Sequence, residues 1–392
     1  MTPRRPFRLD LAGLAPRPAQ VWGGIRLVPL VRDEPLPGLR LHARLYEGEA
    51  GPVSVRPGTA YVSYIPHGFV ADWGADAGHT GPGAAYGTHL RRGAPEGEPV
   101  AYVPVRAHRR MVQREAKRRL RFLPLHLAVE GYLALHFGGP PIAWDEWSRR
   151  ALRTGLSPRV EEACTGAAVR GLSDALRVFE LHPGQCGVMV YAADALATAF
   201  VVPHPDDFRA LHTTLINDLY GELVHHYALL SAAVPDFVPR LPDVAGLAQL
   251  RAAVAEEQRG WAAFHDGIMA ADLLGPEYIA QTAYRAGDFT LLRFLPPFRP
   301  HQENHIGEAI TAPDGRVGYL KTFRLSETQT RRGHLLTRLA AHDWHLSATA
   351  TDLGLTDGQL ALRLESAGFG FLLRPEVLAA YRRAAKPRTN RR

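Results

Sequence analysis

The spacing of the apolar residues changes along the chain, and it limits the possible folds more than any other property. Between residues 20 and 105 apolar residues form short runs or alternate with polar ones, as in Ile25–Leu30, Leu39–Tyr46 and Thr59–Ile65. Glycine and proline separate these runs, which is typical of β-strands joined by turns. Three later segments carry apolar residues every three or four positions, as amphipathic helices do: Trp144–Thr154, Pro158–Glu180 and Pro205–Leu230.

The middle of the chain mixes both patterns. Gly187–Tyr191 and Ala197–Val202 predict a strand pair, and Val244–Leu274 predicts a long helical pair. Hairpins are expected to turn at Arg285–Asp288 and at Pro313–Gly315. We therefore predict an α+β fold. It has a β-rich N-terminal part (1–105), a mixed body with short strand pairs and hairpins (106–325), a C-terminal trihelical, helix-turn-helix-like module (326–373) and a basic tail (374–392).

The composition indicates a folded protein. Of the 392 residues, 46% are hydrophobic and 22% are charged, which provides enough apolar surface for buried cores and argues against wholesale disorder. Cys164 and Cys186 are too few for a disulfide framework. We expect no membrane-spanning segment and no secretory signal after Arg4 and Arg5, and hence a cytoplasmic location without a membrane partner.

Positive charge is concentrated in two stretches. Residues 374–392 carry a net charge of +6 and residues 106–121 carry +7, which leaves −6 for the rest of a chain whose total is +7. A local basic strip is typical of phosphate binding, although a solvated tail or surface has the same composition. The predicted phosphate-binding strip consists of Arg109, Arg110, Arg114, Lys117 and Arg118.

Two groups of residues have a spacing that could hold a metal ion. On the predicted helix 205–230, the side chains of His212, Glu222 and His226 share the apolar face, where they could form a satisfied core cluster or ligate a metal. The second group, His301, Glu303 and His305, alternates in sequence, so an extended segment would point all three to one side. Alternatively, these three residues form a polar strand edge that faces solvent.

No cofactor is predicted. Gly81, Gly83 and Gly87 lack the strand–loop–helix setting of a phosphate-binding loop. Cys186 follows a glycine turn and has His182 nearby, which is compatible with a nucleophile, but the start of an apolar strand is also where cysteine serves as a small hydrophobic residue.

One resemblance covers about residues 20–230. It is carried by Ile25–Leu30, by the run His182–Val190, by Phe200–Val202, and by Asp207-Phe208 with the helix after them. These features resemble the ARPP family, the ADP-ribosylglycohydrolase- and rhodanese-phosphatase-superfamily-associated protein domain. Because that family is defined by gene neighbours, the resemblance implies a link to ADP-ribose or phosphate-ester processing and provides no catalytic residues.

The segment Ser347–Gly368 resembles a helix-turn-helix of the Fis type. Ser347 and Thr356 could cap two short helices, Gly354 could form the left-handed turn between them, and Leu336–Trp344 would be the supporting helix. The resemblance implies DNA contact, and with the basic tail it gives these candidates: Thr356, Gln359, Arg363, Arg382, Arg383, Lys386 and Arg388. Packing or dimerisation is the alternative, because the expected reading helix is poor in basic residues.

The leading hypothesis from the sequence is a protein that recognises a phosphorylated or ADP-ribose-like small molecule and contacts DNA through its C-terminus. The alternatives are an enzyme acting on a phosphate ester or glycosidic bond, with or without a metal, and an interaction or scaffold protein. An oligomeric state is compatible with all three hypotheses. Neither a substrate nor catalysis itself follows from the sequence.

Overall fold

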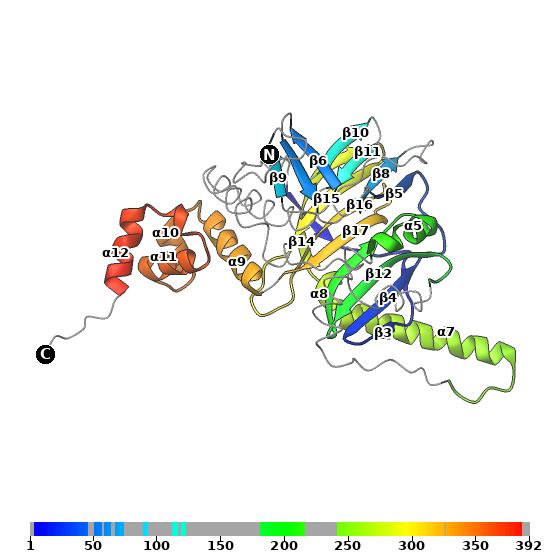
Figure 1. The fold of residues 1–392 in the computed structure, drawn as a ribbon. Coiled ribbons are helices and arrows are strands. Elements are labelled where there is room, and N and C mark those ends of the chain that lie inside the picture. The colour runs from blue at the N-terminus through cyan, green and yellow to red at the C-terminus, as the bar shows by residue number, and fades with distance from the viewer. Residues whose placement is uncertain are drawn as a thin grey trace.

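The computed structural model describes residues 4–45, 51–56, 59–63, 67–73, 89–92, 112–116, 119–122, 181–215, 241–325 and 327–385. For the strands between residues 42 and 122 the backbone alone is described. The architecture is α+β, as the sequence predicts: antiparallel sheets form the body, and helices gather towards the C-terminus (Figure 1).

A 10-stranded antiparallel sheet is the centre of the fold. Its order is β1-β14-β15-β16-β17-β13-β12-β4-β2, with β3 also paired to β4. The strands are β1 (Arg4–Arg8), β2 (Ala15–Pro16), β3 (Gln20–Trp22), β4 (Ile25–Val31), β12 (Gln185–Ala192), β13 (Ala195–Val201), β14 (Glu277–Ala286), β15 (Phe289–Leu295), β16 (His305–Thr311) and β17 (Val317–Arg324).

The first strands of the chain pair with strands that come far later in the sequence. Arg4 of β1 lies opposite Gln281 of β14, and Val31 of β4 lies opposite Gln185 of β12. The large sheet therefore takes strands from both the 1–105 and the 106–325 parts of the body.

Two smaller sheets accompany it. One has the order β10-β11-β8-β5 and the other has the order β6-β7-β9. Their strands are β5 (Leu39–Leu45), β6 (Gly51–Arg56), β7 (Thr59–Ser63), β8 (His67–Trp73), β9 (His89–Arg92), β10 (Val112–Ala116) and β11 (Arg119–Phe122).

One face of the large sheet packs against helices from the middle of the chain. These are α7 (Leu247–Phe264), a π-helix, η5 (His265–Met269), and α8 (Ala271–Leu274); α5 (Pro205–Leu215) contacts β5 and β12. The core on this face joins Trp261 and Leu273 to alternate residues of the strands, among them Val28, Met189, Ala199, Phe294 and Leu320. Most of α7 extends beyond this core, away from the sheet (Figure 1).

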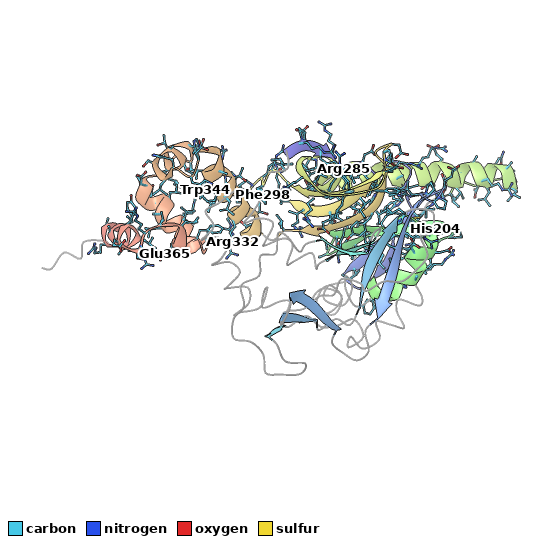
Figure 2. All side chains as sticks on the ribbon, turned by 90° about the horizontal axis from the view of Figure 1, so that it is seen from above. His204, Arg285, Phe298, Arg332, Trp344 and Glu365 are labelled. Atoms are coloured by element: carbon cyan, nitrogen blue, oxygen red, sulfur yellow. The ribbon has the colours of Figure 1, made fainter. Side chains whose placement is uncertain are left out.

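The C-terminal helices lie on the opposite side of the sheet from α7 (Figure 1). They are α9 (Glu327–Ala341), α10 (Leu346–Asp352), α11 (Asp357–Ser366), the 3-10 turn η6 (Gly370–Leu372) and α12 (Pro375–Ala385). One core cluster contains Leu295 and Ile306 of the sheet together with Leu336, Leu360 and Leu364 of the helices. Phe298, labelled in Figure 2, lies where the sheet and α9 meet.

The structure confirms the hairpins, and the helical region 244–274 contains α7, η5 and α8. Two details of the C-terminal helices differ from the sequence predictions. The first helix spans α9 rather than 336–344, and His345 rather than Ser347 caps α10, because its ring accepts from Ala348 N at 3.2 Å. The predicted helices 144–154 and 158–180 lie outside the described residues.

Among the described residues, no helix has both the length and the apolar character needed to cross a membrane.

Candidate functional site

A buried histidine with unused ring nitrogens lies at the start of β16. His305 is 0% exposed, and neither ring nitrogen has a hydrogen-bond partner in the described part of the chain. Its Nε2 lies 3.8 Å from Glu303, whose other carboxylate oxygen pairs with Arg324 at 2.9 Å. Burial opposes ionisation of Glu303, but the neighbouring His305 and Arg324 outweigh it and lower the pKa of this carboxyl.

The loop before β16 determines which residues join this cluster. Asn304 holds the loop because its side chain accepts from Arg299 N at 3.0 Å and donates to the carbonyl oxygens of Arg299 and Gln302. His301 lies in the turn of this loop with φ of 63° and is exposed. Residues 301–305 are therefore not a continuous extended segment, and the structure brings Glu303 and His305 together without His301.

A second polar chain connects the surface to the core. The hydroxyl of Tyr191 lies 2.8 Å from His265 Nε2, and His265 Nδ1 lies 2.7 Å from Asp266 Oδ1. A carboxylate only accepts hydrogen bonds, so Nδ1 carries a proton, and in the neutral imidazole Nε2 then accepts from the hydroxyl of Tyr191. Tyr191 and His265 are both 0% exposed, whereas the side chain of Asp266 is 49% exposed.

His265 is the first residue of the π-helix η5, and the centroid of its ring lies 6.0 Å from that of Trp261. Such bulges often mark functional sites. Burial raises the pKa of Tyr191, and the charges of Asp266 and Glu303 raise it further. The charge of Glu303, in the first cluster, thus acts on Tyr191 in the second.

The opposite face of the sheet carries a row of buried ionisable groups. Arg293, Glu308 and Lys321 are direct neighbours on β15, β16 and β17, and Arg293 Nε donates to Glu308 at 2.7 Å. Burial raises the pKa of Glu308 against the opposing effect of Arg293, and it lowers the pKa of Lys321 to about 7. Perturbed pKa values of buried groups occur both at active sites and in structural ion networks.

The C-terminal helices present one uncovered face of α11. Thr356, its N-cap, accepts from Gln359 N at 3.2 Å, and Gln359 Oε1 accepts from Thr356 N at 2.9 Å, which completes a capping box. Gly354 forms the preceding turn with φ of 65°. Leu360 and Leu364 point into the core, whereas Gln359, Arg363 and Ser366 are exposed.

Helix α12 covers a different side of α11. The ring of Tyr381 lies against Gly358, and Arg382 pairs with Glu365. Figure 2 shows Glu365 on these helices, on the side of the molecule away from His204. Arg363 makes no side-chain hydrogen bond or ion pair with the described residues, so its guanidinium group is available to a partner.

Other predicted site residues are placed as follows. His212 is half-buried on α5 next to Phe208, and burial lowers its pKa. Arg383 is exposed on α12. Arg114 lies in β10, where only the backbone is described; Arg109, Arg110, Lys117, Arg118, Glu222, His226, Lys386 and Arg388 lie outside the described residues. Within the described residues no three acidic, histidine or cysteine side chains form a metal-binding group.

Sequence reasoning did not identify the Tyr191–His265–Asp266 chain. The available signal was a histidine followed by an aspartate near the end of a helical segment, and nothing local links it to a tyrosine 74 residues away. By contrast, the prediction that Cys186 lies on an apolar strand is confirmed: its side chain is 0% exposed, and burial raises the pKa of the thiol to about 11.

Comparison with known proteins gives one clear match. The ARPP-2 family model matches residues 9–287, which is most of the chain. The protein belongs to the ARPP-2 family. The match extends beyond the region of resemblance, 20–230, and ends at the turn between β14 and β15, so α9–α12 lie outside it. No curated protein and no solved structure is significantly similar to this ARPP-2 protein.

Proposed function

We propose that this ARPP-2 protein is a cytoplasmic protein of two parts, in which the sheet body binds a small phosphorylated or ADP-ribose-like ligand and the C-terminal helices contact DNA. The observation that carries the DNA contact is the uncovered face of α11 with Gln359, Arg363 and Ser366. The resemblance to the ARPP family supports the ligand class. The succession of α9, α10 and α11, with Gly354 in a left-handed turn before α11, supports the proposal of a helix-turn-helix.

The charges favour contact with the DNA backbone over extensive base reading. Residues 327–385 contain seven arginines and six acidic residues, so the described helices are almost neutral. Residues 386–392 add Lys386 and three arginines. Because Gln359 Oε1 is used in the capping box and Tyr381 covers Gly358, Arg363 is the side chain of α11 best placed for a guanine edge or a phosphate.

The test is the binding of duplex DNA to the full chain, measured by fluorescence anisotropy at several salt concentrations. Arg363→Ala should weaken binding by about 1 to 3 kcal/mol. Removing residues 386–392 should make the slope of the logarithm of the binding constant against the logarithm of the salt concentration shallower, by about 0.9 for each lost phosphate contact. Arg209→Ala is the matched control, because Arg209 is an exposed arginine on α5 of the body. Unchanged affinity in both test proteins would exclude the proposed DNA contact.

A second candidate function is acid–base catalysis on a phosphate ester or glycosidic bond. The buried ring of His305, whose nitrogens have no hydrogen-bond partner among the described residues, lies beside Glu303 and favours this function. Phosphate esters and ADP-ribosyl conjugates should then be hydrolysed by the wild type and not by His305→Gln. If metal ions are required, metal analysis of the pure protein should give close to one equivalent. A rate equal to that of the buffer for every substrate would reject this candidate.

A further inference from the structure

Arg32 follows β4 directly, and its side chain reaches across the ends of neighbouring strands. Its main-chain N–H donates to Gly184 O at 2.9 Å, and its Nη2 donates to Val317 O at 2.5 Å. Val317 begins β17, which β13 and β12 separate from β4 in the sheet. The guanidinium group is therefore held in place over the ends of the central strands.

This guanidinium group is buried without enough hydrogen-bond acceptors. Arg32 is 3% exposed, and its Nε and Nη1 have no partner in the described part of the chain. Burying a cation without partners is strongly unfavourable, and burial accordingly lowers the pKa of Arg32. Most proteins pair such a group with a carboxylate.

The carboxylates within electrostatic reach are already engaged. Asp314 acts on Arg32, but it lies 2.6 Å from Arg316 Nε, and the charge of Arg316 itself opposes protonation of Arg32. Asp207 acts on the neighbouring Cys186, but its Oδ1 accepts from Arg40 at 2.7 Å and its Oδ2 from the main chain of β5.

The thiol of Cys186 does not supply the missing negative charge. It is fully buried, and burial raises its pKa to about 11, so it is neutral at pH 7. Arg32 and Arg316 together with Asp314 leave one positive charge uncompensated. The side chains of Arg316 and Asp314 are 36% and 50% exposed, so this positive region is close to solvent.

We propose that Arg32 anchors a binding site for an oxyanion, the phosphate or carboxylate group of a small ligand. Oxyanion oxygens accept charge-assisted hydrogen bonds from Nε and Nη1, which removes the cost of the buried cation. This site would be the place where the body binds the small ligand of the proposed function. The chemical class of that ligand rests on the proposed function. Contact of α11 with DNA does not depend on it.

The experiment follows thermal unfolding of the full chain while sodium phosphate replaces sodium chloride at constant ionic strength. The Tm of the wild type should rise and saturate, because phosphate binds the folded state. Arg32→Met should bind phosphate at least tenfold more weakly. Without phosphate its Tm should equal or exceed that of the wild type, because a buried unpaired charge has been removed.

The matched control is Arg26→Met. Arg26 is a buried arginine within β4, the strand that Arg32 follows, but it pairs with Asp194 at 3.2 Å. This variant should have a lower Tm and should keep the full rise with phosphate. Parallel titrations with sodium acetate and with ADP-ribose identify the anion: either a carboxylate or a phosphate response that depends on Arg32 supports the site.

Three results would overturn the inference. In the first, the Tm of the wild type does not respond saturably to phosphate or to acetate. In the second, Arg32→Met responds to the anions as strongly as the wild type. In the third, Arg32→Met without anion loses as much Tm as Arg26→Met does. If Arg32→Met does not fold, Arg32→Lys and the broadening of the phosphate ³¹P resonance provide the same comparison. If Arg32→Met still binds ADP-ribose, the ligand does not bind at Arg32, but the proposed ligand class remains correct.

Discussion

Replacing Gly333 with alanine should destabilise the protein by overpacking the contact between α9 and Phe298. Gly333 is buried on α9, and a methyl group built there would lie 2.2 Å from Cδ1 and Cε1 of Phe298. Carbon atoms in contact are normally about 3.5 to 4.0 Å apart, so the overlap exceeds 1 Å. Phe298 is 2% exposed, so its ring is enclosed by the core and has little room to move away.

The expected loss follows from two opposing effects. Overpacking of a core costs about 1 to 3 kcal/mol or more, whereas alanine in a helix is favoured over glycine by about 1 kcal/mol. Because the overlap involves three ring atoms, we expect Gly333→Ala to lower the free energy of unfolding by about 1 to 2 kcal/mol. Gly260→Ala in α7, where the methyl group meets nothing within 4 Å, should raise it by about 0.5 to 1 kcal/mol.

Urea denaturation of both variants measures the difference through the midpoint and the slope. A double-mutant cycle with Phe298→Ala then tests the cause. Phe298→Ala alone should cost about 3 to 5 kcal/mol, and in the Gly333→Ala background it should cost at least 1 kcal/mol less. If Gly333→Ala is as stable as Gly260→Ala, or if Gly333→Ala and Phe298→Ala are additive, steric overlap with Phe298 is not the cause.

Three further predictions concern single side chains. Lys321→Met should gain most stability over the wild type at pH 7 and below. Burial lowers the pKa of Lys321 from 10.5 to about 7 in the folded state. Between pH 7 and 10 only the unfolded state keeps this proton, so the stability of the wild type rises by up to about 1.4 kcal/mol per pH unit. A pH-independent difference in urea unfolding would contradict this. Thr356→Ala should lose about 1 kcal/mol, and Thr356→Ser should lose clearly less, because the hydroxyl caps α11 through Gln359 N; equal losses by chemical denaturation would reject the capping role. Tyr191→Phe should cost about 1 to 3 kcal/mol in the same assay, because it leaves His265 Nε2 buried without a donor, and a neutral effect would show that this hydrogen bond adds no stability.

Local signals in the sequence determine the hairpins and the short C-terminal helices. The turn between β14 and β15 contains Gly287 with φ of 62°, and the turn between β16 and β17 contains Gly315 with φ of 88°. Thr356 and Gln359 form the capping box within four residues of sequence. Such features depend on neighbours in the chain, so composition and spacing are enough to predict them.

Tertiary structure alone decides how the two ends of the body combine. Nothing near Arg4 or Val31 specifies pairing with Gln281 or Gln185, because any exposed strand edge offers the same backbone groups. Every residue of β4 and of β12 is buried, so their pairing follows from packing on both faces of the sheet, which only the complete fold provides. The contacts between Tyr191 and His265, and between Arg32 and Val317, arise only when distant strands and helices have packed, so no local pattern could predict these sites.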